Sequence, residues 1–300
     1  MNFDGIFTPA ITPLKADGSI DPVAFAEVLE YLIDSKVHGV IIGGSTGEYY
    51  AHSAQERIEL AKKAKEVIGA RLPLVIGTGA IRTEDSVQFA EQARHIKADA
   101  ILVGSPPYAL PTQNEIAAHV LAVDQAAGLP IMLYNYPARM GVAMGNEFFD
   151  AVAHCKNIVA IKESSGEMAR LHRLATAHPS IQLSCGWDDQ ALEFFAWGAR
   201  SWVCAGSNFI PHEHVALYQA CVIEKNFDKG RRIMAAMLPL MDFLETGKFV
   251  QSIKYGSELS GLRAGGVRAP LKGLEESEKA ELAAVVTTLR QTVAHITGEA

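Results

Sequence analysis

The cysteines of this 300-residue chain form no motif, because Cys155, Cys185, Cys204 and Cys221 lie far apart and no CxxC pair occurs. Structural zinc sites and redox-active dithiols need closely spaced cysteines, so the sequence indicates neither. Widely spaced single thiols are typical of proteins in a reducing compartment. We therefore expect reduced, buried cysteines in a cytoplasmic protein.

An excess of basic residues and long apolar runs are also missing. The formal net charge is -7, so no basic surface for nucleic acid or an anionic membrane is expected. Residues 1–5 lack the succession of basic, apolar and small residues of a signal peptide, and no uncharged apolar run is long enough to span a membrane. These absences favour a soluble protein whose partner is a small molecule.

Short apolar runs instead alternate with helical patterns along most of the chain. We expect strands at residues 5–13, 39–44, 74–77, 100–104, 131–135, 158–163, 181–186 and 202–206. Repeated strand and helix units form a parallel sheet, and eight of them close into a barrel. An open, doubly wound sheet is the alternative, but residues 7–13 carry prolines where that fold normally has a glycine-rich dinucleotide turn.

Helix starts support this division. Ser53 with Glu56, and Thr112 with Glu115, have the spacing of a capping box. After residue 206 the pattern is helical to the end, with helices expected at residues 211–224, 228–244, 249–259 and 274–297. The sequence therefore predicts a (β/α)8 TIM barrel, of class α/β, over residues 1–224 and a C-terminal helical extension over residues 225–300.

Lys162 ends the apolar run that begins at Ile158. A buried strand end is poor in water, and burial lowers the pKa of a lysine, which makes its amine a nucleophile toward a carbonyl carbon. A Schiff-base lysine is one interpretation. The other is a lysine that extends to solvent or pairs with Glu163.

Other polar residues follow neighbouring predicted strands, at the barrel edge where such folds build their active sites. The turn with Ser45, Thr46 and Gly47 offers hydroxyls and backbone amides to a carboxylate. Tyr134 is a candidate proton carrier, or a packed tyrosine, and Arg139 can hold a carboxylate through two hydrogen bonds.

Acids and histidines end the last two strands. Asp188 and Asp189 could accept hydrogen bonds from hydroxyl groups, although Asp188 could equally cap the following helix. His212 and His214 flank Glu213, but no third ligand is evident, so we expect no metal site.

In order, the segments Gly43–Glu48, Tyr134–Pro137 and Ile161–Glu163 resemble the signatures of the dihydrodipicolinate synthase and N-acetylneuraminate lyase family. The likeness extends from Thr8 to Leu271. It implies a (β/α)8 barrel with a helical extension, assembled as a homotetramer of tight dimers. It also implies a class I lyase that needs no metal and no dissociable cofactor.

The resemblance implies roles for individual residues. Lys162 would form an imine with pyruvate or another 2-oxo acid, and Tyr134 would relay protons. Ser45 and Thr46 would bind the 2-oxo acid carboxylate, with Ser45 also in the relay. Tyr108 would cross the dimer interface to the relay of the partner.

The second substrate remains open, because the chain shows features of two branches. Arg139 is similar to the arginine that holds the carboxylate of the aldehyde in the synthases. The features similar to sugar-acid contacts of the lyase branch are Gly186, Asp188, Asp189, Ser164 and Ser207.

Three functions follow. The nearest named activity is 4-hydroxy-tetrahydrodipicolinate synthesis from pyruvate and aspartate semialdehyde. The enzymatic alternative is an aldolase or dehydratase for 2-oxo-3-deoxy sugar acids or N-acetylneuraminate. The non-enzymatic alternative is a barrel that has lost its catalytic activity and serves only in binding. Positions of the lysine feedback site of regulated synthases carry residues unlike those that bind lysine, so we expect no inhibition by lysine; these positions are Ala54, Arg57, Ile81 and Pro107.

Overall fold

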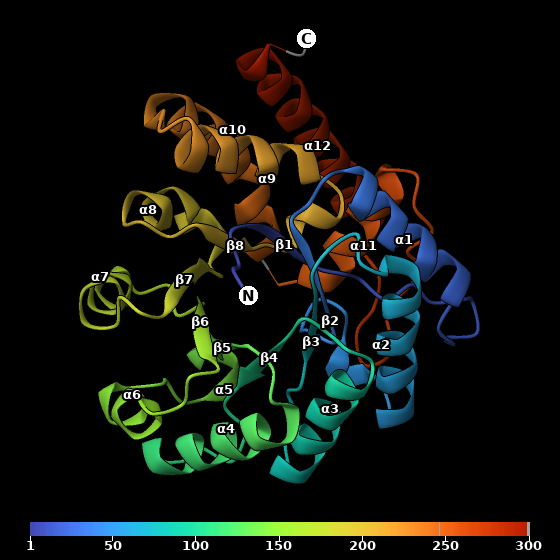
Figure 1. Cartoon of the computed structure of the whole chain (residues 1–300). Coiled ribbons are helices and arrows are strands. Elements are labelled where there is room, and N and C mark those ends of the chain that lie inside the picture. Colours follow the sequence, from blue (N-terminus) through green and yellow to red (C-terminus); the bar gives the residue numbers. More distant parts are fainter. Residues whose placement is uncertain (246, 299–300) are drawn as a thin grey trace.

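The computed structural model describes residues 1–245 and 247–298 and contains a closed barrel of parallel strands (Figure 1). The strands are β1 Gly5–Pro9, β2 Gly39–Ile42, β3 Leu74–Gly77, β4 Ala100–Gly104, β5 Ile131–Asn135, β6 Ile158–Glu163, β7 Gln182–Cys185 and β8 Ser201–Val203. Each strand pairs with its neighbour in sequence, and β1 pairs with β8 through Gly5 and Ser201. This closing pair excludes the open sheet and confirms the predicted TIM barrel.

Some strands are shorter than expected. Strand β1 ends at Pro9, and the residues after it, up to Pro13, belong to no strand. The backbone N–H of Ile11 donates instead to the side-chain oxygen of Asn208. Strand β8 ends at Val203 because the short helix η3 (Gly206–Asn208) follows almost at once. The apolar residues beyond these ends are buried by packing and not by strand pairing.

Helices surround the barrel (Figure 1). Their bounds are α1 Pro22–Asp34, α2 Ala54–Ile68, α3 Thr83–His95, α4 Gln113–Ala127, α5 Pro137–Met140, α6 Asn146–Val152, α7 Met168–Ala177 and α8 Ala191–Ala196, with short helices η1 Tyr49–Ala51 and η2 Asp188–Gln190. Both predicted capping boxes are confirmed: Ser53 and Thr112 each accept a bond from the backbone three residues on, and Glu56 and Glu115 bond back to the cap residues.

The side chains of each strand alternate between two cores. Inward residues, such as Met132 and Ala160, fill the barrel interior. Outward residues, such as Leu133 and Ile161, pack between the sheet and the helices. This alternation decides which polar residues at a strand end enter the barrel mouth.

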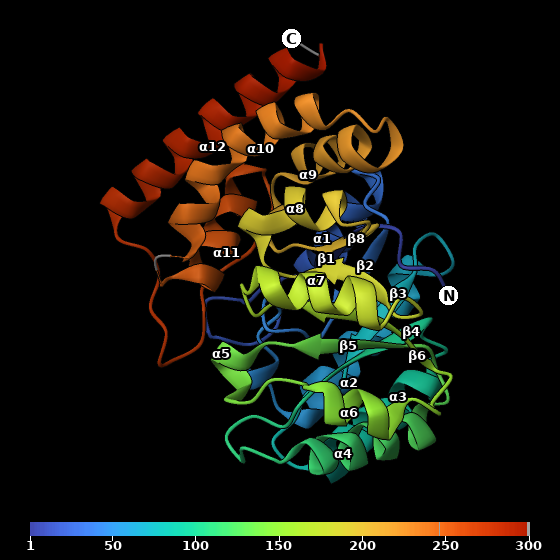
Figure 2. The ribbon, with the colours of Figure 1, turned by 90° about the vertical axis from the view of Figure 1, so that its left-hand side faces the viewer.

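The chain ends in a helical extension that packs on one side of the barrel (Figure 2). The barrel part ends with α9 Pro211–Tyr218 and the π-helix η4 Gln219–Ile223, and the extension contains α10 Phe227–Glu245, α11 Phe249–Leu259 and α12 Glu276–Thr297. Helices α10 and α12 lie side by side in both views. The expected extension is confirmed, whereas its boundary at residue 224 stays a prediction. In the described part of the chain, no helix has the length and apolar character needed to cross a membrane.

Candidate active site

Lys162 and Tyr134 lie side by side inside the barrel mouth. They are partners in the register between β5 and β6, and each follows an inward-facing residue by two positions. The Lys162 Nζ lies 4.3 Å from the centroid of the Tyr134 ring. The strand register therefore brings the amine and the phenol together, as their positions at strand ends suggested.

Glu163 points to the opposite face of the sheet and does not pair with Lys162. Its carboxylate accepts bonds from Asn135 Nδ2 at 2.9 and 3.0 Å and from Arg170 Nε at 3.2 Å, all buried. The interpretation of Lys162 as the ion-pair partner of Glu163 is therefore wrong, because adjacent residues of a strand face opposite sides.

Burial shifts the acidity of both groups. Removal from water lowers the pKa of Lys162 from 10.5 to about 8, and the nearby Asp188 carboxylate opposes this shift. Burial raises the pKa of Tyr134 to about 12, against Arg139 and hydrogen bonds from Ser45 and Ser164. At neutral pH the phenol thus keeps its proton, whereas about a tenth of the amine is neutral, far more than for a lysine with the usual pKa of 10.5.

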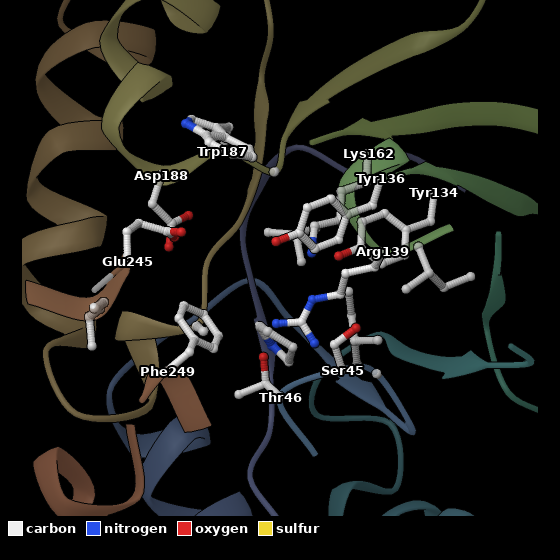
Figure 3. A pocket seen from close by; sticks show the side chains of 18 of the residues that line it. Ser45, Thr46, Tyr134, Tyr136, Arg139, Lys162, Trp187, Asp188, Glu245 and Phe249 are labelled. Carbon is white, nitrogen blue, oxygen red and sulfur yellow. The ribbon is translucent and has the colours of Figure 1, made fainter. Parts of the chain in front are cut away.

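A cavity of about 160 Å³ opens above these two residues (Figure 3). The polar side chains on its wall are Ser45, Thr46, Tyr134, Tyr136, Arg139, Lys162, Trp187, Asp188 and Glu245. Its apolar wall includes Ile41, Leu102, Val203, Leu244 and Phe249.

Two glycines make room for these groups. A Cβ on Gly186, which lines the cavity, would lie 2.7 Å from Lys162 Cε. A Cβ on Gly47 would lie 2.5 Å from the Ala10 carbonyl oxygen, so this residue shapes the Ser45 turn from behind. Glycine is therefore required at both positions by packing.

The remaining expected site residues lie outside the cavity wall. Ser164 Oγ donates to the Gly186 carbonyl at 2.8 Å, and Ser207 Oγ donates to the Cys204 carbonyl at 2.6 Å deep in the core. Asp189 is exposed and faces Glu193 and Asp242. Tyr108 is 90% exposed, with its backbone at φ 73°.

Asp188 accepts a hydrogen bond from Trp202 Nε1 at 2.8 Å, and its side chain caps no helix. The capping interpretation of Asp188 is therefore wrong. Burial raises the pKa of Asp188 to about 6, against the Trp202 bond and Lys162. His214 packs on the Trp202 ring and bonds to the Ile210 carbonyl. Within the described residues, no group of three or more metal-binding side chains occurs.

Several contributions to the site had no local sequence signal. Glu245 and Phe249 reach the cavity from α10 and α11, more than 80 residues beyond Lys162. Glu48, directly after the Ser45 turn, forms a buried ion pair of 2.6 Å with Lys254 of α11. Only the docking of the extension on the barrel brings these residues to the site.

The chain matches the model of the dihydrodipicolinate synthetase family over residues 2–289. It belongs to this family. The resemblance inferred from the three motifs is confirmed, and with it the expectation of an enzyme of the lyase type, since curated relatives are synthases.

Individual relatives cover nearly the whole chain. A 4-hydroxy-tetrahydrodipicolinate synthase from Exiguobacterium sibiricum is 34% identical over 281 residues, which are 93% of this chain and 96% of the relative. The structure of the synthase from Methylacidiphilum fumariolicum SolV is 30% identical, with a TM-score of 0.92 and 99% of each chain covered. A prophage protein of the family from E. coli K12, solved in complex with pyruvate, is 28% identical, with a TM-score of 0.91 and coverage of 97% of this chain and 99% of the other.

Proposed function

We propose that this chain is a Schiff-base lyase that condenses pyruvate with aspartate semialdehyde, the activity of a 4-hydroxy-tetrahydrodipicolinate synthase. The observation that carries the proposal is the buried amine of Lys162 beside the Tyr134 phenol, both on the wall of one cavity. The names of the relatives support the choice of substrates.

The first half of the reaction uses the inner end of the cavity. The neutral Lys162 amine attacks the keto carbon of pyruvate, and loss of water gives an iminium. Ser45 and Thr46 bind the carboxylate. The iminium withdraws electrons, so a proton leaves the methyl group and an enamine forms. Because Tyr134 is protonated and bonded to Ser45, it passes protons through its hydroxyl and does not act as a phenolate.

The second half uses the outer end. The enamine carbon attacks the aldehyde carbon of the second substrate, so a new carbon–carbon bond forms and the aldehyde oxygen takes up a proton. Hydrolysis of the product imine, which uses the equivalent of the water lost in the first half, then frees the Lys162 amine. Arg139 lines the cavity and packs on the Tyr136 ring at 5.4 Å, which orients its guanidinium. We assign to Arg139 the carboxylate of the aldehyde substrate.

We also propose that the enzyme is a homotetramer of tight dimers in which Tyr108 completes the relay of the partner. Tyr108 and Leu110 follow β4, Ile81 follows the neighbouring β3, and all three are exposed apolar side chains. Exposed apolar groups that follow two neighbouring strands favour burial of this edge against another protein surface. Size measurement in solution, combined with activity of Tyr108→Phe, tests this assembly.

Borohydride trapping tests the Schiff base. Incubation with pyruvate and borohydride should add one reduced pyruvyl group to wild type, detected by intact mass. Lys162→Arg should give no adduct, because a guanidinium does not form the imine. Lys156→Arg is the matched control, since Lys156 is exposed just before β6, and it should behave as wild type. Wild type without an adduct contradicts the proposal.

A second measurement tests the carboxylate assignment. Arg139→Ala should lower kcat/KM for aspartate semialdehyde about 10- to 100-fold, as expected for a lost charge-assisted hydrogen bond. Pyruvate trapping should be unchanged. Equal turnover in the variant and in wild type would show that Arg139 does not hold the aldehyde.

A further inference from the structure

The outer end of the cavity has charges of opposite sign on facing walls. Arg139 and Tyr136 form one wall, and Asp188 and Glu245 form the other (Figure 3). The two carboxylates come from different elements, η2 and the end of α10, and Figure 3 shows them pointing toward one another. A molecule in this space therefore meets a cation on one side and two acids on the other.

The acidic wall has no evident structural cause in α10. Glu245 is the last residue of this helix, where the helix dipole disfavours a carboxylate, and the last turn contains no basic residue. Burial raises the pKa of Glu245, and neighbouring Asp189 raises it further while Arg139 opposes the change.

The neighbours of Asp188 leave one of its oxygens available to a ligand. Trp202 Nε1 donates to Oδ1, and this bond holds the carboxylate from the core side. The Trp202 ring is itself fully buried and packs on Phe195 of α8 and His214 of α9. Asp188 is therefore rigidly placed, whereas Glu245 is exposed at the cavity mouth.

We infer that Glu245, together with Asp188, selects a second substrate that carries an ammonium group next to its carboxylate. This inference rests on the proposed function. A second substrate whose aldehyde carbon faces the enamine on Lys162, and whose carboxylate is held by Arg139, would present a neighbouring ammonium to the acidic wall. An ammonium forms hydrogen bonds to both carboxylates and neutralises part of their charge. The helical extension thus contributes Glu245 to the substrate-binding site, and Glu245 determines the preference for an aldehyde that carries an ammonium group.

The test compares two aldehydes that differ in this group alone. Aspartate semialdehyde carries the ammonium, and succinate semialdehyde lacks it. Pyruvate and each aldehyde are mixed with enzyme, borohydride is added, and intact mass separates protein with pyruvate from protein with the larger aldol product. The readout is the aldehyde concentration that gives half conversion to the larger adduct.

Glu245→Gln keeps the size of the side chain and removes its charge. We expect the half-conversion concentration to rise about 10- to 100-fold for aspartate semialdehyde and to stay unchanged for succinate semialdehyde. Asp242→Asn is the matched control: it removes the same charge from the same helix, is exposed and does not line the cavity. It should behave as wild type with both aldehydes.

Other outcomes overturn the inference. An equal loss for both aldehydes would show a structural role, and no loss for either would show that Glu245 does not contact the substrate. A larger loss in trapping of 2-oxo-3-deoxygluconate than of aspartate semialdehyde would assign the acidic wall to hydroxyl groups. Each of these results leaves the pyruvate adduct intact, whereas failure of the proposed function removes the adduct from wild type.

Discussion

The buried ion pair between Glu48 and Lys254 gives the sharpest prediction about stability. Lys254 Nζ lies 2.6 Å from Glu48 Oε1, with the side chains 2% and 1% exposed, and it donates to the Gly266 carbonyl at 2.6 Å. Glu48 has a left-handed backbone at φ 54°, a conformation that needs support from its surroundings. Its amide bonds to the Ser45 carbonyl, so the pair anchors the turn that we assign to the pyruvate carboxylate.

Lys254→Met keeps most of the side-chain volume and leaves Glu48 buried without its cation. Loss of one partner of a buried pair costs about 3–5 kcal/mol, a large share of a typical free energy of unfolding of about 5–15 kcal/mol. The double variant Glu48→Gln with Lys254→Met removes both charges and should recover most of this loss, because no uncompensated charge remains. Urea unfolding measures both free energies.

Lys248→Met is the matched control. Lys248 pairs with Glu278 at 2.7 Å, but these side chains are 38% and 33% exposed. An exposed pair contributes about 0–1 kcal/mol. Burial, and not the length of the ion pair, should therefore decide the loss. Equal losses for Lys248→Met and Lys254→Met, or a loss below about 1 kcal/mol for Lys254→Met, would refute this reasoning.

Four further predictions concern the active site and the positions of the lysine feedback site. Because burial lowers the pKa of Lys162 from 10.5 to about 8, the rate of pyruvate trapping should rise as the pH increases through about 8 and then level off. A rate that keeps rising to pH 10.5 would mean that the amine has its ordinary pKa. The same shift means that the unfolded chain binds a proton that the folded chain lacks, so Lys162→Met should raise the free energy of unfolding at pH 7 by up to about 3 kcal/mol in urea titrations. This gain should vanish above pH 10.5, and the absence of any gain at pH 7 would count against burial of the charge. Tyr134→Phe should lower kcat about 10²- to 10⁴-fold in the condensation assay while the purified protein still unfolds like wild type, and near-normal kcat would remove Tyr134 from the relay. Lysine at millimolar concentration should not inhibit the condensation, because Arg57, at one of the positions of the lysine feedback site, is buried, donates to the Gly77 and Gly79 carbonyls and lies 3.6 Å from the Phe89 ring centroid. Inhibition in the same assay would contradict this prediction.

The barrel and the centre of its site could be predicted from local patterns. Alternating apolar runs and helical segments specify parallel strands, and a strand has a side-chain period of two, so residues two positions apart share a face. Lys162 and Tyr134 end neighbouring strands at matching positions, and strand pairing leaves few ways to separate them. Capping boxes at Ser53 and Thr112 are equally local, since each is satisfied within one helical turn.

The hydroxyl groups and acids around this centre depended on the tertiary structure. Ser164 and Ser207 lie near the predicted site, yet their hydroxyls bond to carbonyls of neighbouring segments, and Asp189 turns outward while adjacent Asp188 faces the cavity. A sequence motif states which polar group is present but not which partner satisfies it.

The contribution of the helical extension was decided entirely by packing. Glu245 reaches the cavity and Lys254 reaches Glu48 because α10 and α11 dock over the open end of the barrel. The sequence by itself determined the repeated strands, the helices and the reactive pair, since these follow from interactions within a segment or between adjacent strands. Only the tertiary structure decided the outer wall of the cavity, because long-range docking arises from the summed burial of many side chains and no single motif encodes it.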